Sequence, residues 1–260
     1  MAYENLILER DGAVAVVTIN RPKVLNALNS ATMEELTAVM GELGADDSVR
    51  AIVLTGAGEK SFVAGADINE LAVQTPVGGR DHAQRGQRVL DTIEQLGKPV
   101  VAAINGFAFG GGCELAMACT LRVAADTAKL GQPEINLGLI PGYAGTQRLT
   151  RLVGRGVALE ILLTGDAISA AEAHRIGLVN RVVPAADLMS EAKALAQHLA
   201  SKAPVAARFI IDAVTRGADL PLAHAQVYET TLFGLVSTTD DMREGTRAFL
   251  EKRKAEFKGR

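Results

Sequence analysis

The sequence lacks tryptophan and contains only two cysteines and four histidines in 260 residues. The two cysteines, Cys113 and Cys119, cannot build a disulfide scaffold, and their spacing matches no metal-binding motif. The histidines are scattered along the chain, which argues against a zinc site made of histidine side chains. We therefore expect neither a disulfide-stabilised fold nor a metal centre.

The chain also lacks a strong charge of either sign. The 27 lysines and arginines are opposed by 30 aspartates and glutamates, which gives a net charge of −3. A general nucleic-acid-binding protein carries a basic excess or a basic stripe. Here the basic side chains cluster only in the tail, residues 251–260. We expect no nucleic-acid partner.

Long hydrophobic runs are absent as well. No apolar stretch approaches the roughly 20 residues that span a bilayer. The first twelve residues contain three acidic side chains and no signal-peptide core. Hydrophobic residues nevertheless make up 48% of the sequence, which is enough to bury a core and excludes a disordered chain. The expectation is a soluble globular protein in the cytoplasm, with no membrane partner.

Strand-like and helix-like periods alternate through the first part of the chain. Residues 6–19 read as a hairpin with a central Asp-Gly turn, and Asn29 then offers a helix cap. Short apolar runs at residues 49–55, 100–104 and 121–125 read as buried strands, with helical periodicity between them. This alternation predicts an α/β architecture.

From Asp187 onward the sequence shows only helical periodicity. We predict an α/β body of residues 1–200 and an all-helical region of residues 201–260. The C-terminal helices have narrow apolar faces, which indicates that some of them are completed by a neighbouring subunit.

Two loop-to-helix junctions, residues 62–68 and 105–114, each follow a predicted strand. The second contains three consecutive glycines, which a fold keeps where the chain turns tightly or another group comes close. The first N–H groups of a helix have no partner within it. Two such junctions side by side could aim two N–H groups at one oxygen, as in an oxyanion hole. The alternative is that the glycines only let a helix pack on a strand. Neither segment matches a nucleotide-binding fingerprint.

Two carboxylates follow these turns in apolar surroundings, Glu114 in Cys-Glu-Leu-Ala-Met and Glu134 in Gln-Pro-Glu-Ile-Asn-Leu. An apolar setting raises the pKa of a lone acid, and buried acids are usually paired or functional. Together they suggest a general acid/base pair. The alternatives are a buried salt bridge for Glu114 and an ordinary surface loop for Glu134.

These motifs resemble those of the crotonase (enoyl-CoA hydratase/isomerase) superfamily, and most closely its short-chain enoyl-CoA hydratases. The resemblance runs through nearly the whole chain, and the order and spacing of the motifs are specific. The segments that carry it are 21–28 (RPKVLNAL), 64–68 (AGADI), 105–106 (NG), 110–114 (GGGCE), 131–134 (GQPE), 145–149 (GTQRL), 163–165 (LTG), 243–245 (REG) and 249–253 (FLEKR).

The resemblance implies an enzyme that adds water reversibly across the 2,3 double bond of a short-chain trans-2-enoyl-CoA to give a 3-hydroxyacyl-CoA. The backbone N–H groups of Ala66 and Gly111 would bind the thioester oxygen. Glu114 and Glu134 would hold one water between them. Glu114 would help to activate this water for attack at C3, and Glu134 would deliver a proton to C2.

The resemblance also implies the fold, the assembly and the substrate contacts. The fold would be a spiral of ββα repeats with a helical trimerisation region, giving a homotrimer or a homohexamer. Coenzyme A is part of the substrate, so no separate cofactor is expected. Phe249 and Lys252 of the C-terminal helices would close over the CoA nucleotide, from this chain or from a neighbouring subunit. The other implied substrate-binding residues are Lys23, Val24, Leu25, Ala64, Asp67, Ile68, Gly110 and Pro133.

The presence of both acids favours a hydratase, because isomerases of this superfamily typically keep only one of them. A methylglutaconyl-CoA-type hydratase is an alternative that uses the same two acids and needs a basic side chain at the acyl end of the pocket. An enoyl-CoA isomerase is another. A non-catalytic acyl-CoA-binding or RNA-binding protein of the same fold is the alternative from a different class, and the net charge of −3 argues against RNA.

One segment departs from the superfamily pattern, which often reads Pro-Gly-Ala/Gly-Gly-Gly-Thr after the second acid. Here residues 141–146 read Pro-Gly-Tyr-Ala-Gly-Thr. The large residue Tyr143 either packs on its own loop or narrows the acyl pocket. The second reading predicts a preference for acyl groups of C4 to C6.

Overall fold

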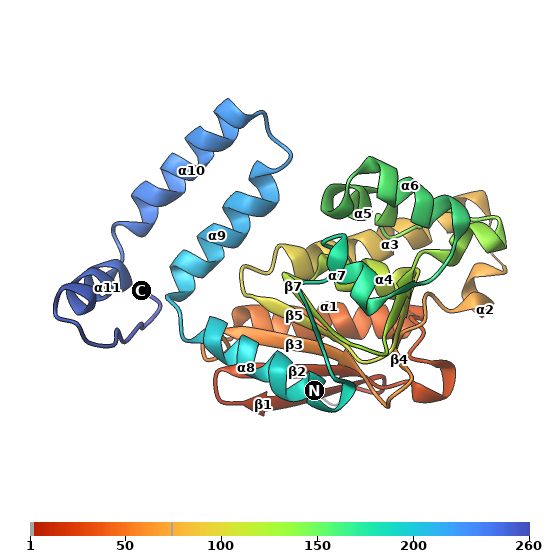
Figure 1. The fold of residues 1–260 in the computed structure, drawn as a ribbon, viewed down its shortest axis with the longest axis horizontal. Helices are drawn as coiled ribbons and strands as arrows, with labels where there is room; N and C mark the ends of the chain where they lie inside the picture. Colours follow the sequence, from red (N-terminus) through yellow and green to blue (C-terminus); the bar gives the residue numbers. More distant parts are fainter. Residues whose placement is uncertain (1–2, 74) are drawn as a thin grey trace.

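The computed structural model describes residues 3–73 and 75–260. Two sheets form the body of the molecule (Figure 1). The larger is parallel except for the antiparallel pair β1 and β2, and the smaller is parallel except for β8 and β9. In spatial order, the larger sheet contains β1 (Leu6–Asp11), β2 (Val14–Ile19), β3 (Ala51–Gly56), β5 (Val100–Ile104), β7 (Leu121–Ala125) and β10 (Arg181–Val183). The smaller sheet contains β4 (Ser61–Val63), β6 (Phe107–Phe109), β8 (Lys129–Gly131) and β9 (Ile168–Ser169).

Helices surround these sheets and extend beyond them at the C-terminal end. The α-helices are α1 (Ser30–Ala45), α2 (Ile68–Leu71), α3 (Pro76–Glu94), α4 (Gly111–Ala118), α5 (Gly145–Val153), α6 (Arg155–Thr164), α7 (Ala170–Arg175), α8 (Leu188–Ala200), α9 (Pro204–Gly217), α10 (Leu222–Val236) and α11 (Asp240–Leu250). Three short 3₁₀ helices are η1 (Pro22–Val24), η2 (Pro133–Leu137) and η3 (Ala185–Asp187).

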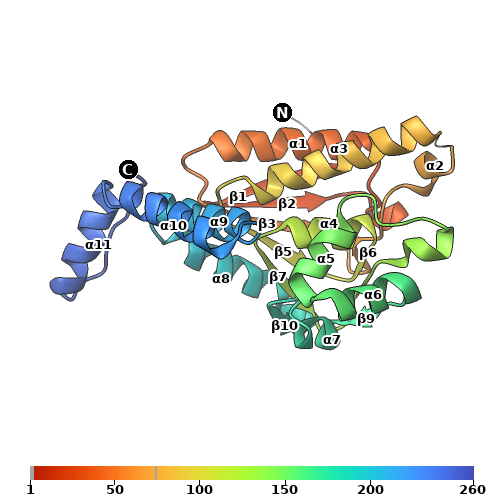
Figure 2. The same ribbon diagram turned by 90° about the horizontal axis from the view of Figure 1, so that it is seen from above.

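The core lies between the larger sheet and the helices on its two faces. Every residue of β3 and β5 is buried, as expected of parallel strands that are covered on both faces. Helices α1 and α3 lie on one side of the sheet and α8 on the other (Figure 2). The sequence predicted these strands, the hairpin and helix α1, and the structure confirms them. The side chain of Asn29 accepts a hydrogen bond from the Thr32 amide and caps α1 as predicted.

The smaller sheet brings three distant segments of the chain together. Its parallel strands β4, β6 and β8 lie side by side, so their carboxyl ends meet at one edge. At that edge β4 leads into Ala64, β6 leads into Gly110, and β8 leads through Gln132 into η2. In α/β sheets, ligands bind outside the carboxyl ends of the strands. The sequence did not predict this sheet, because strands of two or three residues are too short to show a period.

The three C-terminal helices project away from the body (Figure 1). Helix α9 contains no buried residue, and α10 contains only Leu232. The tail is held by Asp241, whose carboxylate accepts hydrogen bonds from the amides of Lys258 and Gly259. Within the described residues, no helix combines the length and the apolar character needed to cross a membrane. The assignment of residues 201–260 to oligomerisation stays a prediction.

Candidate active site

A cavity of about 680 Å³ opens at the edge where β4, β6 and β8 end. We call it the main cavity, and its volume is in the usual range for ligand sites. Its lining includes both predicted acids and both predicted oxyanion-hole residues, namely Ala66, Gly111, Glu114 and Glu134. Three loop segments and helix α4 therefore meet in one place, although they are far apart in the sequence.

Two backbone amides, those of Ala66 and Gly111, lie close together in the lining of the main cavity. Gly111 is the first residue of α4, where an N–H has no partner within the helix. A β-carbon built on Gly111 would lie 3.4 Å from the Ala66 amide nitrogen, so the two residues are direct neighbours. Within the described part of the chain, neither amide donates a hydrogen bond to a protein acceptor. Both N–H groups are therefore without a protein acceptor in the described residues, as the predicted oxyanion hole requires.

Glu114 lies one turn into α4 and is 1% exposed. Its Oε1 accepts hydrogen bonds from the amides of Tyr143 (2.8 Å) and Gly145 (2.6 Å). Burial raises the pKa of Glu114 to about 8; the charge of Glu134 adds to this effect, and the two amides oppose it. The hydrogen-bond partners of Glu114 are backbone amides and not a cation, so the buried salt bridge considered above is wrong.

Glu134 is half-buried in η2, directly after β8, so it is not an ordinary surface-loop residue. Burial raises the pKa of its carboxyl group. A β-carbon on Gly110 would lie 2.7 Å from Glu134 Oε1, and Gly110 also has a positive φ of 49°. Both the lack of space and the backbone conformation therefore require glycine at this position. With its amide oriented to donate, the buried Gln132 places its nitrogen 3.0 and 3.1 Å from the two Glu134 oxygens.

The two acids act on each other electrostatically. The charge of Glu134 raises the pKa of Glu114, as expected for neighbouring carboxylates that cannot both ionise easily. The side-chain amide of Gln132 lies close to both acids, because a β-carbon on Gly145 would be 2.9 Å from that amide group and 2.8 Å from Glu114 Oε1. Such a pair titrates as a unit, and at neutral pH it can hold one proton. The pair thus offers one proton donor and one proton acceptor.

The turn at residues 143–145, which binds Glu114, is itself fixed to helix α3. Arg148 is 8% exposed; its Nη1 donates to the Tyr143 carbonyl oxygen (3.0 Å), and its Nη2 reaches Asp91 (2.7 Å) and Glu94 (2.8 Å). Sequence reasoning missed the positioning roles of Gln132 and Arg148. Both lie inside motifs that carried the resemblance, but only their contacts show what they do.

Tyr143 is 3% exposed and lines the main cavity. Its hydroxyl group lies 2.7 Å from His82 Nε2, on α3. The two rings are tilted, with centroids 5.5 Å apart. Tyr143 is thus packed into the site and not merely against its own loop, and its partner His82 was not among the predicted residues.

The remaining predicted substrate-binding residues divide into three groups. Ala64, Ile68, Gly110 and Pro133 line the main cavity. Lys23, Val24 and Leu25, in and after η1, are not among its described lining residues, but the Leu25 carbonyl accepts a hydrogen bond from the amide of the lining residue Ala64 (3.1 Å). Asp67 is also outside the lining; it caps α2 and pairs with Arg21 at 3.4 Å. Phe249 and Lys252 do not reach the cavity in this chain, because α11 lies at the far end of the molecule from α2 and α4 (Figure 1).

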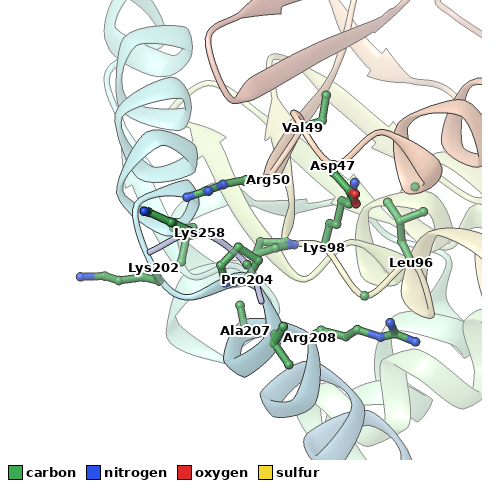
Figure 3. Close-up of a pocket in the computed structure, with 16 residues that line it drawn as sticks. Asp47, Val49, Arg50, Leu96, Lys98, Lys202, Pro204, Ala207, Arg208 and Lys258 are labelled. Atoms are coloured by element: carbon green, nitrogen blue, oxygen red, sulfur yellow. The ribbon is translucent and has the colours of Figure 1, made fainter. Parts of the chain in front are cut away.

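A second cleft, of about 270 Å³, lies where the C-terminal segments meet the body (Figure 3). Its basic lining residues are Arg50, Lys98, Lys202, Arg208 and Lys258. Lys98 Nζ donates to the carbonyl oxygens of Leu43 (2.8 Å) and Asp46 (2.7 Å), and Arg50 donates to that of Phe257 (3.0 Å). Two of these basic side chains thus hold segments of the fold together. Glu114 and Glu134 line the main cavity and not this cleft, so the main cavity is the candidate active site.

Comparisons with known proteins cover the whole chain. The sequence profile of the enoyl-CoA hydratase/isomerase family matches residues 9–260. The short-chain-enoyl-CoA hydratase of Clostridium acetobutylicum is 51% identical over 261 residues, which is 100% of both chains. The crotonyl-CoA hydratase of Syntrophomonas wolfei is 49% identical over 99% of both chains. The solved structure of an enoyl-CoA hydratase from Bacillus anthracis has a TM-score of 0.95 at 40% identity and covers 99% of this chain and 100% of that one. The predicted crotonase-like α/β fold is thereby confirmed.

Proposed function

The chain belongs to the enoyl-CoA hydratase/isomerase family, and on this basis we propose that it is a short-chain enoyl-CoA hydratase. It adds water reversibly across the 2,3 double bond of a trans-2-enoyl-CoA to give a 3-hydroxyacyl-CoA. One observation carries the proposal: the two acids Glu114 and Glu134 line the same cavity as two backbone amides that have no protein acceptor in the described chain.

The amides of Ala66 and Gly111 stabilise the charge that develops during the reaction. When water attacks C3 of the conjugated thioester, electrons move through C2 onto the thioester oxygen, which becomes enolate-like. Two N–H donors that are already in place stabilise this oxygen without reorganisation. In other enzymes, one such donor contributes about 10²–10³-fold in rate.

The acid pair completes the proton transfers. The ionised member accepts a proton from the attacking water, and the protonated member gives its proton to C2. In our assignment Glu114 helps to activate the water and Glu134 protonates C2, so the shared proton must lie on Glu134 when water attacks, although in the free protein burial favours it on Glu114. One proton is taken up and one is given, so the pair still holds one proton at the end of each cycle. An isomerase moves a proton within its substrate and needs only one acid, which is why the observed pair favours a hydratase.

The acyl end of the cavity argues against an acidic substrate. A methylglutaconyl group carries a second carboxylate, which calls for a lysine or arginine beside it. Among the described residues that line the main cavity, none is a lysine or an arginine. We therefore favour an uncharged acyl group.

The direct test is to mix the purified protein with crotonyl-CoA and to follow the loss of absorbance of the conjugated thioester. Rapid hydration is the expected result. A protein that binds CoA esters but leaves crotonyl-CoA unchanged would contradict the proposal. A 3-enoyl-CoA isomerase assay on the same sample would then show whether the alternative activity is present.

The pH dependence of this activity follows from the raised pKa of Glu114, which is about 8. Below that pH the acid pair keeps its shared proton, and above it the last proton is lost. We expect kcat/KM for crotonyl-CoA to fall as the pH rises above about 8, and to fall again in acid, where the pair binds a second proton. A rate profile from pH 5 to 10, with circular dichroism at each pH, tests this. A flat profile between pH 7 and 10 would contradict it.

We further propose that α9, α10 and α11 assemble the chain into a homotrimer or a homohexamer. Large apolar side chains on α9 and α10 are exposed, including Val214 (67%) and Phe233 (72%). Exposed apolar patches of this kind mark interfaces. In such an assembly Phe249 and Lys252 would contact the CoA nucleotide bound to a neighbouring subunit.

Charge placed on this surface should separate the subunits. We expect Val214→Asp and Phe233→Asp to lower the mass measured by light scattering to that of a single chain, because a buried, unpaired carboxylate strongly opposes association. Leu163→Asp on α6 is the matched control, since Leu163 is 66% exposed on the body. A wild-type protein that is already monomeric would refute the proposed assembly.

A further inference from the structure

The main cavity and a neighbouring cleft share one pair of lining side chains among the described residues. This side cleft, of about 220 Å³, lies between α1 and α3 and is lined by Met33, Thr37 and Val89 among others. Among the described residues, only Tyr143 and His82 line both the main cavity and the side cleft. This hydrogen-bonded pair therefore lies between the two spaces and borders both of them.

Close packing holds the Tyr143 ring in this position. A β-carbon built on Gly86 of α3 would lie 2.0 Å from Tyr143 Cδ1, so the ring rests directly on that glycine. At the opposite edge, a β-carbon on Gly111 would lie 3.1 Å from Tyr143 Cε2. The ring thus extends from the amide that binds the thioester oxygen to the wall of α3. It is fixed on two sides by residues that have no side chain.

Tyr143 and His82 form a hydrogen bond with each other, and we call this pair the wall between the main cavity and the side cleft. The hydroxyl group of Tyr143 lies 2.7 Å from His82 Nε2, and with the imidazole proton on Nδ1 the hydroxyl donates this bond. Burial lowers the pKa of His82 and raises the pKa of Tyr143, so both side chains are uncharged at neutral pH. The hydrogen bond removes the need for water in the wall, and the ring presents carbon to the cavity.

We propose that Tyr143, held in place by His82, determines the longest acyl chain that the enzyme accepts. In this proposal the side cleft is an extension of the acyl site, and the Tyr143 ring blocks access to it from the main cavity. The inference rests on the proposed hydratase function and names the specificity-determining residue of the same cavity. A four-carbon acyl group, which is anchored at Ala66 and Gly111, meets the ring after a short distance. Longer chains need the space beyond it, where Met33 and Val89 supply an apolar lining.

The test compares kcat/KM for crotonyl-CoA and trans-2-decenoyl-CoA in the wild type and in Tyr143→Ala. We expect the decenoyl-to-crotonyl ratio to rise by about tenfold or more in the variant, because each methylene that leaves water for an apolar cavity contributes about fourfold. Tyr3→Ala is the matched control: the Tyr3 hydroxyl group bonds Glu42 (3.1 Å), neither residue lines the main cavity or the side cleft, and the ratio should stay at the wild-type value. An unchanged ratio in folded Tyr143→Ala would overturn the proposal.

Three further variants separate ring volume from hydrogen bonding and locate the extension. Tyr143→Phe keeps the ring, so its ratio should change by less than about threefold, which is under the gain from one methylene; a rise as large as that of Tyr143→Ala would contradict the ring as the barrier. His82→Ala opens the same wall from α3 and should also raise the ratio, which provides a second variant if Tyr143→Ala does not fold. Val89→Phe added to Tyr143→Ala should fill the side cleft and return the decenoyl-to-crotonyl ratio toward the wild-type value.

Binding separates failure of this inference from failure of the proposed function. The dissociation constants of butyryl-CoA and decanoyl-CoA, which cannot be hydrated, are measured for the same proteins. If the wild type hydrates no enoyl-CoA, the proposed function fails. A gain in decanoyl-CoA affinity in Tyr143→Ala would still support Tyr143 as the barrier to long acyl chains. If hydration is observed but the ratio of decanoyl-CoA to butyryl-CoA affinity is the same in the wild type and in Tyr143→Ala, Tyr143 is not the barrier to long acyl chains. The proposed hydratase function would still stand.

Discussion

Replacing Glu134 with Gln is expected to lower kcat for crotonyl-CoA hydration by about 10³-fold, because a positioned general acid contributes roughly 10²–10⁴-fold. Gln has nearly the shape of Glu but cannot deliver a proton to C2. The amide can still contact Gln132 and Gly110, so KM should change little. Steady-state kinetics with crotonyl-CoA measure both parameters. Glu114→Gln should show a loss of similar size, because it removes the acceptor for the proton of water.

A matched control for these two variants is Glu160→Gln, which changes an exposed glutamate on α6. It should retain the wild-type rate. Full activity in either Glu134→Gln or Glu114→Gln would contradict the two-acid mechanism. Loss of activity in only one of them would instead favour an isomerase-like use of a single acid, and the isomerase assay described above would then be decisive.

Removing the Gly111 amide hydrogen is expected to have the second large effect. Proline is tolerated at the first position of a helix, where its missing N–H has no helical partner, so Gly111→Pro removes the donor while α4 can still form. We expect kcat/KM to be about 10²–10³-fold lower than in Gly111→Ala. The comparison is made with the alanine variant because any β-carbon here meets Tyr143 Cε2 at 3.1 Å.

The alanine variant therefore reports the steric effect, and the difference between the two variants reports the N–H group. Both proteins are first checked by thermal unfolding and by binding of butyryl-CoA. Equal kcat/KM values in Gly111→Pro and Gly111→Ala would show that the Gly111 amide does not stabilise the transition state.

Local patterns in the sequence were sufficient for the elements that build the core. The Asp-Gly turn predicts the hairpin, the Asn29 cap predicts the start of α1, and continuous apolar runs predict strands that are buried on both faces. Each of these signals depends on neighbouring residues in the chain. The membership of the family came from the order of the motifs, and the comparisons confirm it.

The geometry of the site depends on contacts that no local pattern carries. The strands β4, β6 and β8 have three residues each, yet they bring Ala66, Gly111 and Glu134 to one cavity. Similarly, His82 lies 61 positions from Tyr143, and nothing in the sequence near either residue indicates their hydrogen bond. The roles of the two acids and the two amides in the reaction stay predictions until the variants are measured.

The buried carboxyl group of Glu114 also has a consequence for the durability of the protein. Its pKa rises from 4.5 to about 8 on folding, so its contribution to folding stability is fully present below pH 4.5 and is lost as the pH rises through about 8. The ionised form of Glu114, which accepts the proton of water in our assignment, therefore lowers the folding stability. Glu114→Gln, which removes this charge and keeps an acceptor for two amides, should be nearly inactive yet more resistant to heat than the wild type at pH 8. Equal melting temperatures at pH 8 would contradict this trade-off between activity and stability.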